Sequence, residues 1–464
     1  MGLDLPRIRE RVFRFIEGGA SRYVKLLSDL VSFRSVSAWG SEDLGRCAGY
    51  IADVLRERGF TVSLKSAGGA PVVLAEVGRG SRSVLMYNHY DVQPPDPLEL
   101  WESDPFKLRE VDGLLYGRGT ADNKGNIVAR LWALDSLLDY LEELDLRVKM
   151  LIEGEEEVGS PTLPKVVEEV LDWVRSDGAI WESAYVRRDG RLGIPLGYKG
   201  MLYLELTIRG PSRDVHSGNA PLVPNPVWRL ARLLTYLKTE EGVVLVPGFY
   251  DGVDRGFLEG AEELLRNLSY AELEELKSEL GLKEFVRGLE GLEALRELYT
   301  KPSLNVSGLY AGYTGRGSKT IVPSVAGVKI DIRPVPGQNP AKILENFRRY
   351  LTRLGFTDVE VFVESMYPAG YTRHTEAIVQ ASVRAAREVY GKDPELTPVS
   401  AGSGPIYILT DLAKVPTTGA GVGYYGSRVH APNENIRLRD FELGAKHVAL
   451  TLVEFSALRT PPGR

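Results

Sequence analysis

Residues 151–160 read LIEGEEEVGS, an apolar run that turns into four carboxylates and then a Gly-Ser turn. The stretch that leads into them, Arg147–Ile152, is typical of a buried strand. Open α/β sheets place their active sites at the carboxyl ends of strands, which is where these acids fall. Carboxylates held close together repel one another, so the pattern predicts a positive partner among them. A solvated acidic loop is the alternative interpretation.

The composition is that of a globular protein with more than one domain. The chain has 464 residues, more than one hydrophobic core usually holds, so we expect two domains. A net charge of -6 gives no basic field for nucleic acid or anionic lipid. The single cysteine, Cys47, rules out an intrachain disulfide, and we expect it to be a small buried residue. We find no signal peptide and no apolar run long enough to span a membrane, and we expect a cytoplasmic protein.

A second strand ends in a histidine and an aspartate. Residues 83–94 read SVLMYNHYDVQP. Because side chains alternate along a strand, His89 and Asp91 point to the same side. This spacing suits a metal-bound imidazole oriented by a carboxylate, or two direct ligands. The alternative is a strand end whose polar side chains are hydrogen-bonded and have no functional role.

An aspartate also precedes an apolar-periodic stretch. Residues 116–125 read YGRGTADNKG, and the pattern from Lys124 to Leu141 predicts one long helix. Asp122 is therefore either the N-cap of that helix or a metal ligand at its entrance. The helix leads back to the strand at Arg147, which completes a β-α-β unit. Such a unit brings the polar strand ends to one edge of the sheet.

Two further stretches carry possible ligands. Residues 177–182 predict a short strand that ends at Glu182, and residues 429–434 read VHAPNE, a histidine on a loop. Two histidines and several strand-end carboxylates are typical of a hydrolytic site with two metal ions. Three carboxylates balance two divalent ions once a bridging hydroxide is added, which leaves Glu156 to take the proton from the water. The candidate ligands are His89, Asp122, Glu157, Glu182 and His430.

From Gly200 the pattern changes to strand, helix, two strands, helix and strand. This order is the ferredoxin-like plan, with a Leu/Glu-rich helical insertion at about 243–300. We therefore expect an α+β domain at 200–364, inserted into an α/β domain formed by 1–199 and 365–464, which has a central mixed sheet flanked by helices. The expected strands are 201–208, 303–309, 325–332 and 358–363, and the expected helices of this domain are 224–238 and 340–354. Elsewhere we expect helices at 21–31, 42–58, 164–174, 376–390 and 440–458, a strand near 416–419 and a turn at Gly402-Ser403-Gly404.

These motifs resemble those of the dizinc aminoacylase/carboxypeptidase family, which includes dipeptidases, carnosinases, aminoacylases and succinyl-diaminopimelate desuccinylase. The resemblance covers nearly the whole chain and is closest to the cytosolic non-specific dipeptidase branch. It is carried by HYDVQP at 89–94, GRGTADNKG at 117–125, EEVGS at 156–160 and HAPNE at 430–434. In the inserted domain it is carried by PSLNVSG at 302–308, GSKTIVP at 317–323 and DIRPVP at 331–336.

The resemblance implies a role for each candidate residue. It implies that His89 and Glu182 bind one zinc ion, that Glu157 and His430 bind the other, and that Asp122 bridges them and precedes a cis peptide bond. It also implies that Asp91 orients His89 and that Glu156 is the general base. Asp177 lies near Glu182 in the sequence and competes with it for the ligand position. His374 and His447 match no motif, and we expect surface or packing roles for them.

The inserted domain resembles the lid and dimerisation domain of this family. DVHSG at 214–218 resembles the motif whose histidine, here His216, reaches across a dimer to the neighbouring active site. Arg333 ends an apolar strand, where its guanidinium suits the carboxylate of a substrate. We also expect Gly402 and Ser403 to contact substrate, although Gly402-Ser403-Gly404-Pro405 departs from the branch's usual Gly-Gly-Ser-Ile-Pro loop.

We therefore expect a metal-dependent hydrolase that cleaves dipeptides or short peptides with a free C-terminal carboxylate. Its cofactors would be two divalent ions, zinc or else manganese or cobalt, and its partner a second copy of the chain. Deacylation or desuccinylation of an N-acyl amino acid is the first alternative, because it needs the same metals and base. An inactive binding protein on the same fold is the second.

Overall fold

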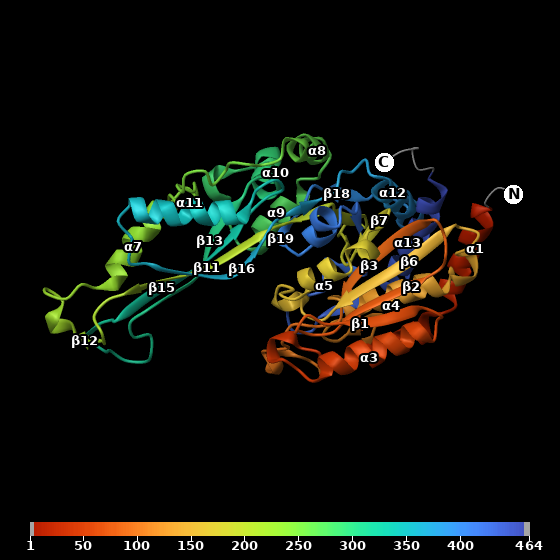
Figure 1. The fold of residues 1–464 in the computed structure, drawn as a ribbon, viewed down its shortest axis with the longest axis horizontal. Helices are drawn as coiled ribbons and strands as arrows, with labels where there is room; N and C mark the ends of the chain where they lie inside the picture. Colours follow the sequence, from red (N-terminus) through yellow and green to blue (C-terminus); the bar gives the residue numbers. More distant parts are fainter. Residues whose placement is uncertain (1–3, 459–464) are drawn as a thin grey trace. The chain divides into compact units, whose positions relative to one another are not determined.

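The structure is a computed structural model that describes residues 4–458 (Figure 1). The chain forms two compact units. Unit 1 comprises Met1–Leu196, Thr372–Thr397 and Ile408–Arg464, and unit 2 comprises Gly197–Tyr371 and Pro398–Tyr407. We had expected the inserted domain at 200–364. The segment 398–407 groups with unit 2 because β19 (Ser400–Ser403), where we expected a turn, pairs in parallel with β10 (Gly197–Lys199).

Unit 1 is built on a six-stranded sheet with the order β1-β2-β6-β3-β7-β20. Strands β6, β3, β7 and β20 are parallel neighbours, whereas β1 and β2 join antiparallel, so the sheet is mixed as expected. The parallel strands β3, β6 and β7 are almost entirely buried, which explains their continuous apolar sequences. The strands are β1 (Thr61–Lys65), β2 (Val72–Val77), β3 (Arg82–His89), β6 (Leu146–Glu153), β7 (Gly178–Trp181) and β20 (Thr417–Gly419).

Helices pack around this sheet, and unit 1 also contains two smaller sheets. The helices of unit 1 are α1 (Leu5–Glu17), α2 (Ala20–Val31), α3 (Asp43–Arg56), α4 (Lys124–Asp135), α5 (Leu163–Glu169), α6 (Leu171–Val174), α12 (Ala377–Tyr390) and α13 (Leu438–Ala457). One small sheet holds β4 (Arg109–Val111), β5 (Leu114–Tyr116) and β22 (Asn435–Arg437). The other holds β8 (Tyr185–Val186), β9 (Leu192–Pro195), β18 (Glu395–Thr397) and β21 (Gly423–Tyr424).

Two helix predictions were wrong in length. The helix from Lys124 ends at Asp135, and a short 3-10 turn follows, so it does not continue to Leu141. Burial explains the error, because α4 is enclosed on all sides and has no solvated face that would give a long amphipathic period. The helix expected at 164–174 is divided into α5 and α6 at Val170, whose φ of -119° and ψ of 25° are not helical.

The unassigned histidine His447 has a packing role, as expected. It lies fully buried on α13, and its Nε2 is 3.1 Å from both the hydroxyl and the carbonyl oxygen of Ser382 on α12. Burial lowers the pKa of His447 to about 4, so the ring is neutral at pH 7. Cys47 is a free, fully buried thiol on α3.

Unit 2 is built on a four-stranded sheet with the order β13-β15-β11-β16, in which all neighbours are antiparallel. In the chain its elements follow one another as strand, helix, two strands, helix and strand. Apolar side chains of β11, β13 and β15 pack against α7 and α11 to form the core of this unit. The bounds are β11 (Met201–Arg209), α7 (Pro226–Leu237), β13 (Ser303–Ala311), β15 (Val325–Arg333), α11 (Pro340–Arg353) and β16 (Glu360–Tyr367).

The segment between α7 and β13 is helical, as its Leu/Glu-rich sequence predicts. Its helices are packed around a small apolar cluster of their own, made by Leu265, Leu268, Leu273, Ala294 and Leu295. They are α8 (Arg255–Leu265), α9 (Ala271–Glu279) and α10 (Gly291–Thr300). The remaining short strands of unit 2 are β12 (Val215–His216), β14 (Ile321–Val322) and β17 (Gly370–Tyr371). Among residues 4–458, no helix combines the length and the apolarity that crossing a bilayer requires.

Candidate active site

The polar strand ends of unit 1 meet at one edge of its sheet. β3 ends at His89 and is paired in parallel with β6 on one side and β7 on the other. The acidic loop follows β6, and Glu182 follows β7 directly. Parallel neighbours have their carboxyl ends at the same edge, so the topology brings together residues that lie far apart in the sequence.

Asp122 lies at the centre of the cluster. Its Oδ1 is 2.9 Å from Nε2 of His89, and its Oδ2 is 3.0 Å from Nε2 of His430. The residue is not the N-cap of α4, because Asn123 occupies that position. The peptide bond between Asp122 and Asn123 is cis, as the resemblance implied. Each oxygen of one carboxylate is therefore directed to a different imidazole.

Each imidazole is also close to a second carboxylate. Nε2 of His89 is 3.3 Å from Oε2 of Glu182, and Nε2 of His430 is 3.3 Å from Oε2 of Glu157. The five predicted ligands thus form two sets that share Asp122. Asp177 belongs to neither set, because its carboxylate accepts hydrogen bonds from the backbone and hydroxyl of Ser83 at the other end of the strands.

These distances fit divalent metal ions. Zinc lies about 2.0–2.1 Å from nitrogen and oxygen ligands, so neighbouring ligand atoms of a tetrahedral site are about 3.3 Å apart. The separations between donor atoms here are 2.9 to 3.3 Å. Oε1 of Glu157 and Oε2 of Glu182 are buried and accept no hydrogen bond from the described residues. Buried carboxylate oxygens without a donor are what a cation would satisfy.

The electrostatics of the cluster also call for positive charge. Burial raises the pKa of Glu182 to about 8, with Asp122 and other acids adding to the shift. Hydrogen bonds that the imidazole of His430 donates to Asp122 and Glu157 raise the pKa of His430 to about 10. Burial lowers the pKa of His89, but the facing carboxylates of Glu182 and Asp122 outweigh it and hold that pKa well above its usual value. The carboxylates of the cluster thus favour positive charge beside them, which a divalent metal ion would supply.

Asp91 connects the histidine strand to the acidic loop. Its Oδ1 is 3.3 Å from Nδ1 of His89, whose Nε2 faces the cluster. The same carboxylate accepts hydrogen bonds from the backbone N–H groups of Glu156 (3.2 Å) and Glu157 (3.0 Å). Asp91 is fully buried. It is placed to orient the imidazole and to fix the loop that presents the two acids.

The four acids of the loop have different surroundings. Glu153 accepts hydrogen bonds from the hydroxyls of Tyr87 (2.6 Å) and Ser160 (2.8 Å), and Glu155 accepts one from Thr162. The carboxylate of Glu156 accepts none from the described residues. Burial raises the pKa of Glu156 well above its usual value, and Glu182 adds to the shift. Glu156 is therefore the acid of this loop whose carboxylate has no hydrogen-bond donor among the described residues and whose pKa is raised.

Several supporting residues were quoted in the motifs without a role. The most connected is Glu434, which is fully buried and accepts backbone hydrogen bonds from Gly119 (3.1 Å), Ala121 (2.9 Å) and Asp122 (3.0 Å). It also pairs with the guanidinium of Arg118 at 2.6 Å. Two amides add contacts: Gln93 donates to Oε2 of Glu157 at 2.8 Å, and Asn123 donates to the carbonyl of Glu182 at 3.2 Å.

The other predicted residues belong to unit 2. His216 is exposed on β12, where its Nδ1 accepts a hydrogen bond from the N–H of Gly218 at 3.0 Å. Arg333 ends β15 and donates to the hydroxyl of Ser403 at 2.8 Å. Ser403 in turn donates to the carbonyl of Gly200, and the N–H of Gly402 donates to the hydroxyl of Ser400. Unit 2 thus brings Arg333 and Ser403 together.

Comparison with known proteins identifies the family. The family model described as "Peptidase family M20/M25/M40" matches residues 85–454, which include every candidate ligand. The chain belongs to this peptidase family. The predicted resemblance to the dipeptidases, carnosinases and desuccinylases is thereby confirmed, and the chain is a metal-dependent hydrolase.

Two similar proteins match over nearly the whole chain. A solved structure, an M20 family metallo-carboxypeptidase from Sulfolobus solfataricus, is 38% identical with a TM-score of 0.88, and the match covers 94% of this chain and 99% of that one. The Beta-Ala-His dipeptidase of Rattus norvegicus is 27% identical over 97% of this chain and 96% of its own length. A succinyl-diaminopimelate desuccinylase of Legionella pneumophila is 28% identical, but over only 46% of this chain and 56% of its own length.

The contacts of Glu434 generate a first prediction. In Glu434→Gln, the neutral amide turns one acceptor into a donor that faces backbone N–H groups, and Arg118 loses its counter-charge. We expect metal affinity to fall about 10–100-fold because the loop that presents Asp122 loosens, and the free energy of unfolding to fall by about 3–5 kcal/mol. Calorimetric zinc titration and urea unfolding measure the two effects.

Glu110→Gln on β4 is the matched control, because Glu110 is exposed and the substitution is chemically the same. A folded Glu434→Gln protein with the zinc affinity of the wild type would show that Glu434 does not position Asp122.

Proposed function

We propose that the protein is a peptidase with two divalent metal ions that cleaves dipeptides or short peptides next to a free C-terminal carboxylate. The observation that carries the proposal is the carboxylate of Asp122, whose two oxygens face two separate histidine and glutamate sets. The proposed ligands of one ion are His89 and Glu182, and those of the other are His430 and Glu157. A mixed imidazole and carboxylate set favours zinc, with manganese or cobalt as substitutes.

Different residues of the chain would carry out the separate parts of the hydrolysis. When bound, the two metal ions supply Lewis acidity toward the peptide carbonyl and a water of lowered pKa. Glu156 takes the proton from the attacking water and passes it to the leaving amine, a use that its raised pKa favours. Asp91 keeps the imidazole of His89 in one orientation.

Unit 2 is proposed as the lid. Its strand order and its strand, helix, two strands, helix and strand sequence support the expected ferredoxin-like plan. We infer that Arg333 binds the substrate carboxylate with Ser403 and Gly402 beside it, because Ser403 already accepts a hydrogen bond from the guanidinium. A planar guanidinium with several donors is well suited to a carboxylate.

We further infer a homodimer in which His216 of one copy serves the active site of the other. His216 is exposed, so it is available to a second chain. Large apolar side chains are exposed on the same unit, as expected for a surface that is covered in a dimer. They include Leu222 (89% exposed), Trp228 (77%), Leu309 (63%) and Phe362 (63%). The single buried cysteine supports the expected cytoplasmic location.

A substrate panel tests the proposed function. Protein purified without chelator is expected to contain two divalent ions per chain, to hydrolyse a dipeptide, and to lose that activity with a chelator until metal is restored. The C-terminal amide of the same dipeptide should react about 10²-fold more slowly, because it offers Arg333 no charge. N-acetyl and N-succinyl amino acids complete the panel. Faster turnover of either would favour the deacylase alternative, and absence of bound metal would overturn the proposal.

The general base is tested by a neutral replacement. Glu156→Gln is expected to bind metal normally but to lose about 10²–10⁴-fold in kcat, because the amide cannot accept the water's proton. Glu155→Gln is the matched control, since Glu155 is one residue away and contacts Thr162 instead of the cluster. Equal losses in both variants, or full activity in Glu156→Gln, would show that the base is misassigned.

The cross-subunit role of His216 is tested by mixing two inactive proteins. In a hybrid dimer of Glu156→Gln and His216→Ala, one site combines an intact Glu156 with the intact His216 of the other chain. Random exchange should therefore restore activity to about one quarter of all sites. Glu156→Gln mixed with the double variant Glu156→Gln/His216→Ala is the control and should stay inactive. Native mass spectrometry confirms that subunits have exchanged. If the exchanged dimers show no activity, the cross-subunit role of His216 is excluded.

A further inference from the structure

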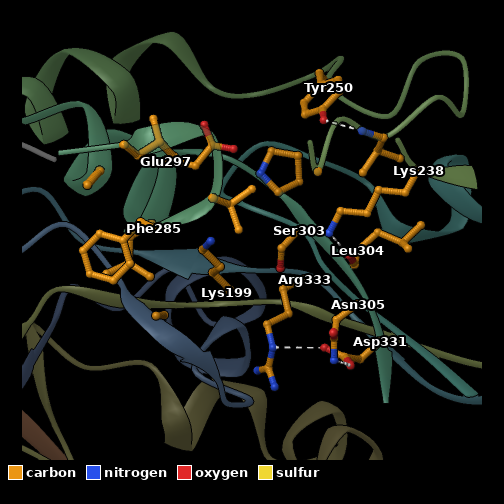
Figure 2. A pocket seen from close by; sticks show the side chains of 18 of the residues that line it. Lys199, Lys238, Tyr250, Phe285, Glu297, Ser303, Leu304, Asn305, Asp331 and Arg333 are labelled. Carbon is orange, nitrogen blue, oxygen red and sulfur yellow. Dashed lines mark hydrogen bonds and ion pairs between the residues drawn. The ribbon is translucent and has the colours of Figure 1, made fainter. Parts of the chain in front are cut away.

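Unit 2 contains a cavity of about 570 Å³ at the edge of its sheet (Figure 2). One wall is polar and comes from the edge strand β13 and the end of β15. The opposite wall is apolar and comes from the helical segment between α7 and β13. Its side chains include Leu273, Leu276, Phe285, Val286, Leu289 and Leu298. A cavity of this size, with mostly apolar walls and a few polar groups, is typical of small-molecule sites.

Two lysines without a carboxylate partner line this cavity. Lys199, the last residue of β10, is only 3% exposed, and its ammonium donates to the carbonyl of Lys301 at 2.7 Å. Lys238 donates in the same way to the carbonyl of Leu304 at 2.7 Å. Within residues 4–458 neither lysine forms an ion pair. A buried ammonium with a single carbonyl acceptor is unfavourable for folding alone, so a ligand that supplies a negative charge would explain it.

The acids that line the cavity are already paired. Glu297 on α10 forms an ion pair with Arg287 at 2.6 Å. Asp331 accepts a hydrogen bond from the amide of Asn305 at 2.9 Å and lies 3.5 Å from the guanidinium of Arg333. An excess of positive charge therefore remains at the two lysines.

Arg333 also lines the cavity, but its guanidinium and the ammonium of Lys199 are directed differently (Figure 2). In Figure 2 the ammonium of Lys199 rises into the lined space toward Glu297, whereas the guanidinium of Arg333 extends away from it. Arg333 donates instead to Ser403. The charge that a ligand would meet inside the cavity is thus that of Lys199, with Lys238 adding positive potential.

We propose that this cavity binds a small organic carboxylate with an apolar body, its carboxylate held by Lys199 and its body packed against Phe285, Leu276 and Leu289. The apolar wall excludes a fully polar anion such as inorganic phosphate as the preferred occupant, because it would leave that surface without a partner. The site adds to the proposed function and does not depend on it, since binding is measured without turnover.

The protonation of Lys199 should make carboxylate binding at this site depend on pH. Burial, together with the charge of Arg333 on β15, lowers the pKa of Lys199 to about 8, and Glu297 on α10 opposes this shift. Lys238 and Asp331 are the other charged side chains of the lining. At pH 7 the ammonium is charged and attracts a carboxylate. Above pH 8 the free amine is increasingly neutral, so binding of the carboxylate must draw in a proton and weaken as the pH rises.

Calorimetric titration of the metal-loaded enzyme with 3-phenylpropionate tests the proposal. We expect saturable binding at pH 7, with the uncharged 3-phenylpropanamide at least about tenfold weaker. Lys199→Met should lower the affinity for the acid at least about tenfold, and should leave Tm unchanged or higher because a buried charge is removed. Titrations in two buffers of different ionisation enthalpy at about pH 9 should reveal proton uptake in the wild type and none in the variant.

Two more variants locate the bound probe. Leu276 is 42% exposed, so Leu276→Trp is expected to fold, to fill the cavity and to weaken binding at least about tenfold. Arg333→Met removes the proposed substrate contact and should change the affinity less than about twofold. Failure of the wild type to bind at about 10 mM overturns the proposal. Unchanged binding in Lys199→Met or in Leu276→Trp also overturns the proposal. Loss of binding in Arg333→Met alone overturns it as well, because that result would assign the probe to the substrate site.

Discussion

The structure of unit 1 depends on one electrostatic constraint: three carboxylates and two imidazoles converge on a space where only positive charge relieves their repulsion. Asp122 sits between the two imidazoles and would be poorly placed beside either carboxylate without them. The parallel pairing of β6, β3 and β7 is what forces these groups together, because each strand ends at the same edge. The fold thus concentrates negative charge in the cluster, and divalent metal ions are what would compensate it.

Such a cluster needs a rigid support, and buried acids that contact backbone rather than metal provide it. Asp91 holds two successive N–H groups of the acidic loop, and Glu434 holds three N–H groups of the turn before α4. Both are almost completely enclosed. In a medium of low polarity, a carboxylate that accepts several hydrogen bonds fixes the loop strongly, so Glu157 and Asp122 are each presented by a segment that is itself tied to an acid.

The sequence was sufficient to predict those features of the fold and the site that follow from local periodicity. Alternation along a strand placed His89 and Asp91 on one side, and the β-α-β connection predicted that the acids would meet them. The sequence was insufficient where a side chain's contacts depend on residues that are distant in the chain. Nothing in the sequence around Glu434 indicates that its side chain turns inward to a loop more than 300 residues earlier. Likewise α4 was predicted too long because its complete burial removes the polar face that would have marked its end.

The cavity of unit 2 could not be predicted from the sequence either, because it too depends on residues that are distant in the chain. Lys199 is the last residue of an ordinary short strand, and a lysine at a strand end is normally solvated. Only the packing of the segment between α7 and β13 against the sheet edge encloses it, and that packing joins residues about 100 positions apart, such as Lys199 and Lys301. A methionine at this position would avoid a buried charge and fill similar space. That the chain carries a lysine there, opposite an apolar wall, is more readily explained by a ligand than by the fold, since folding alone gives no reason to bury it.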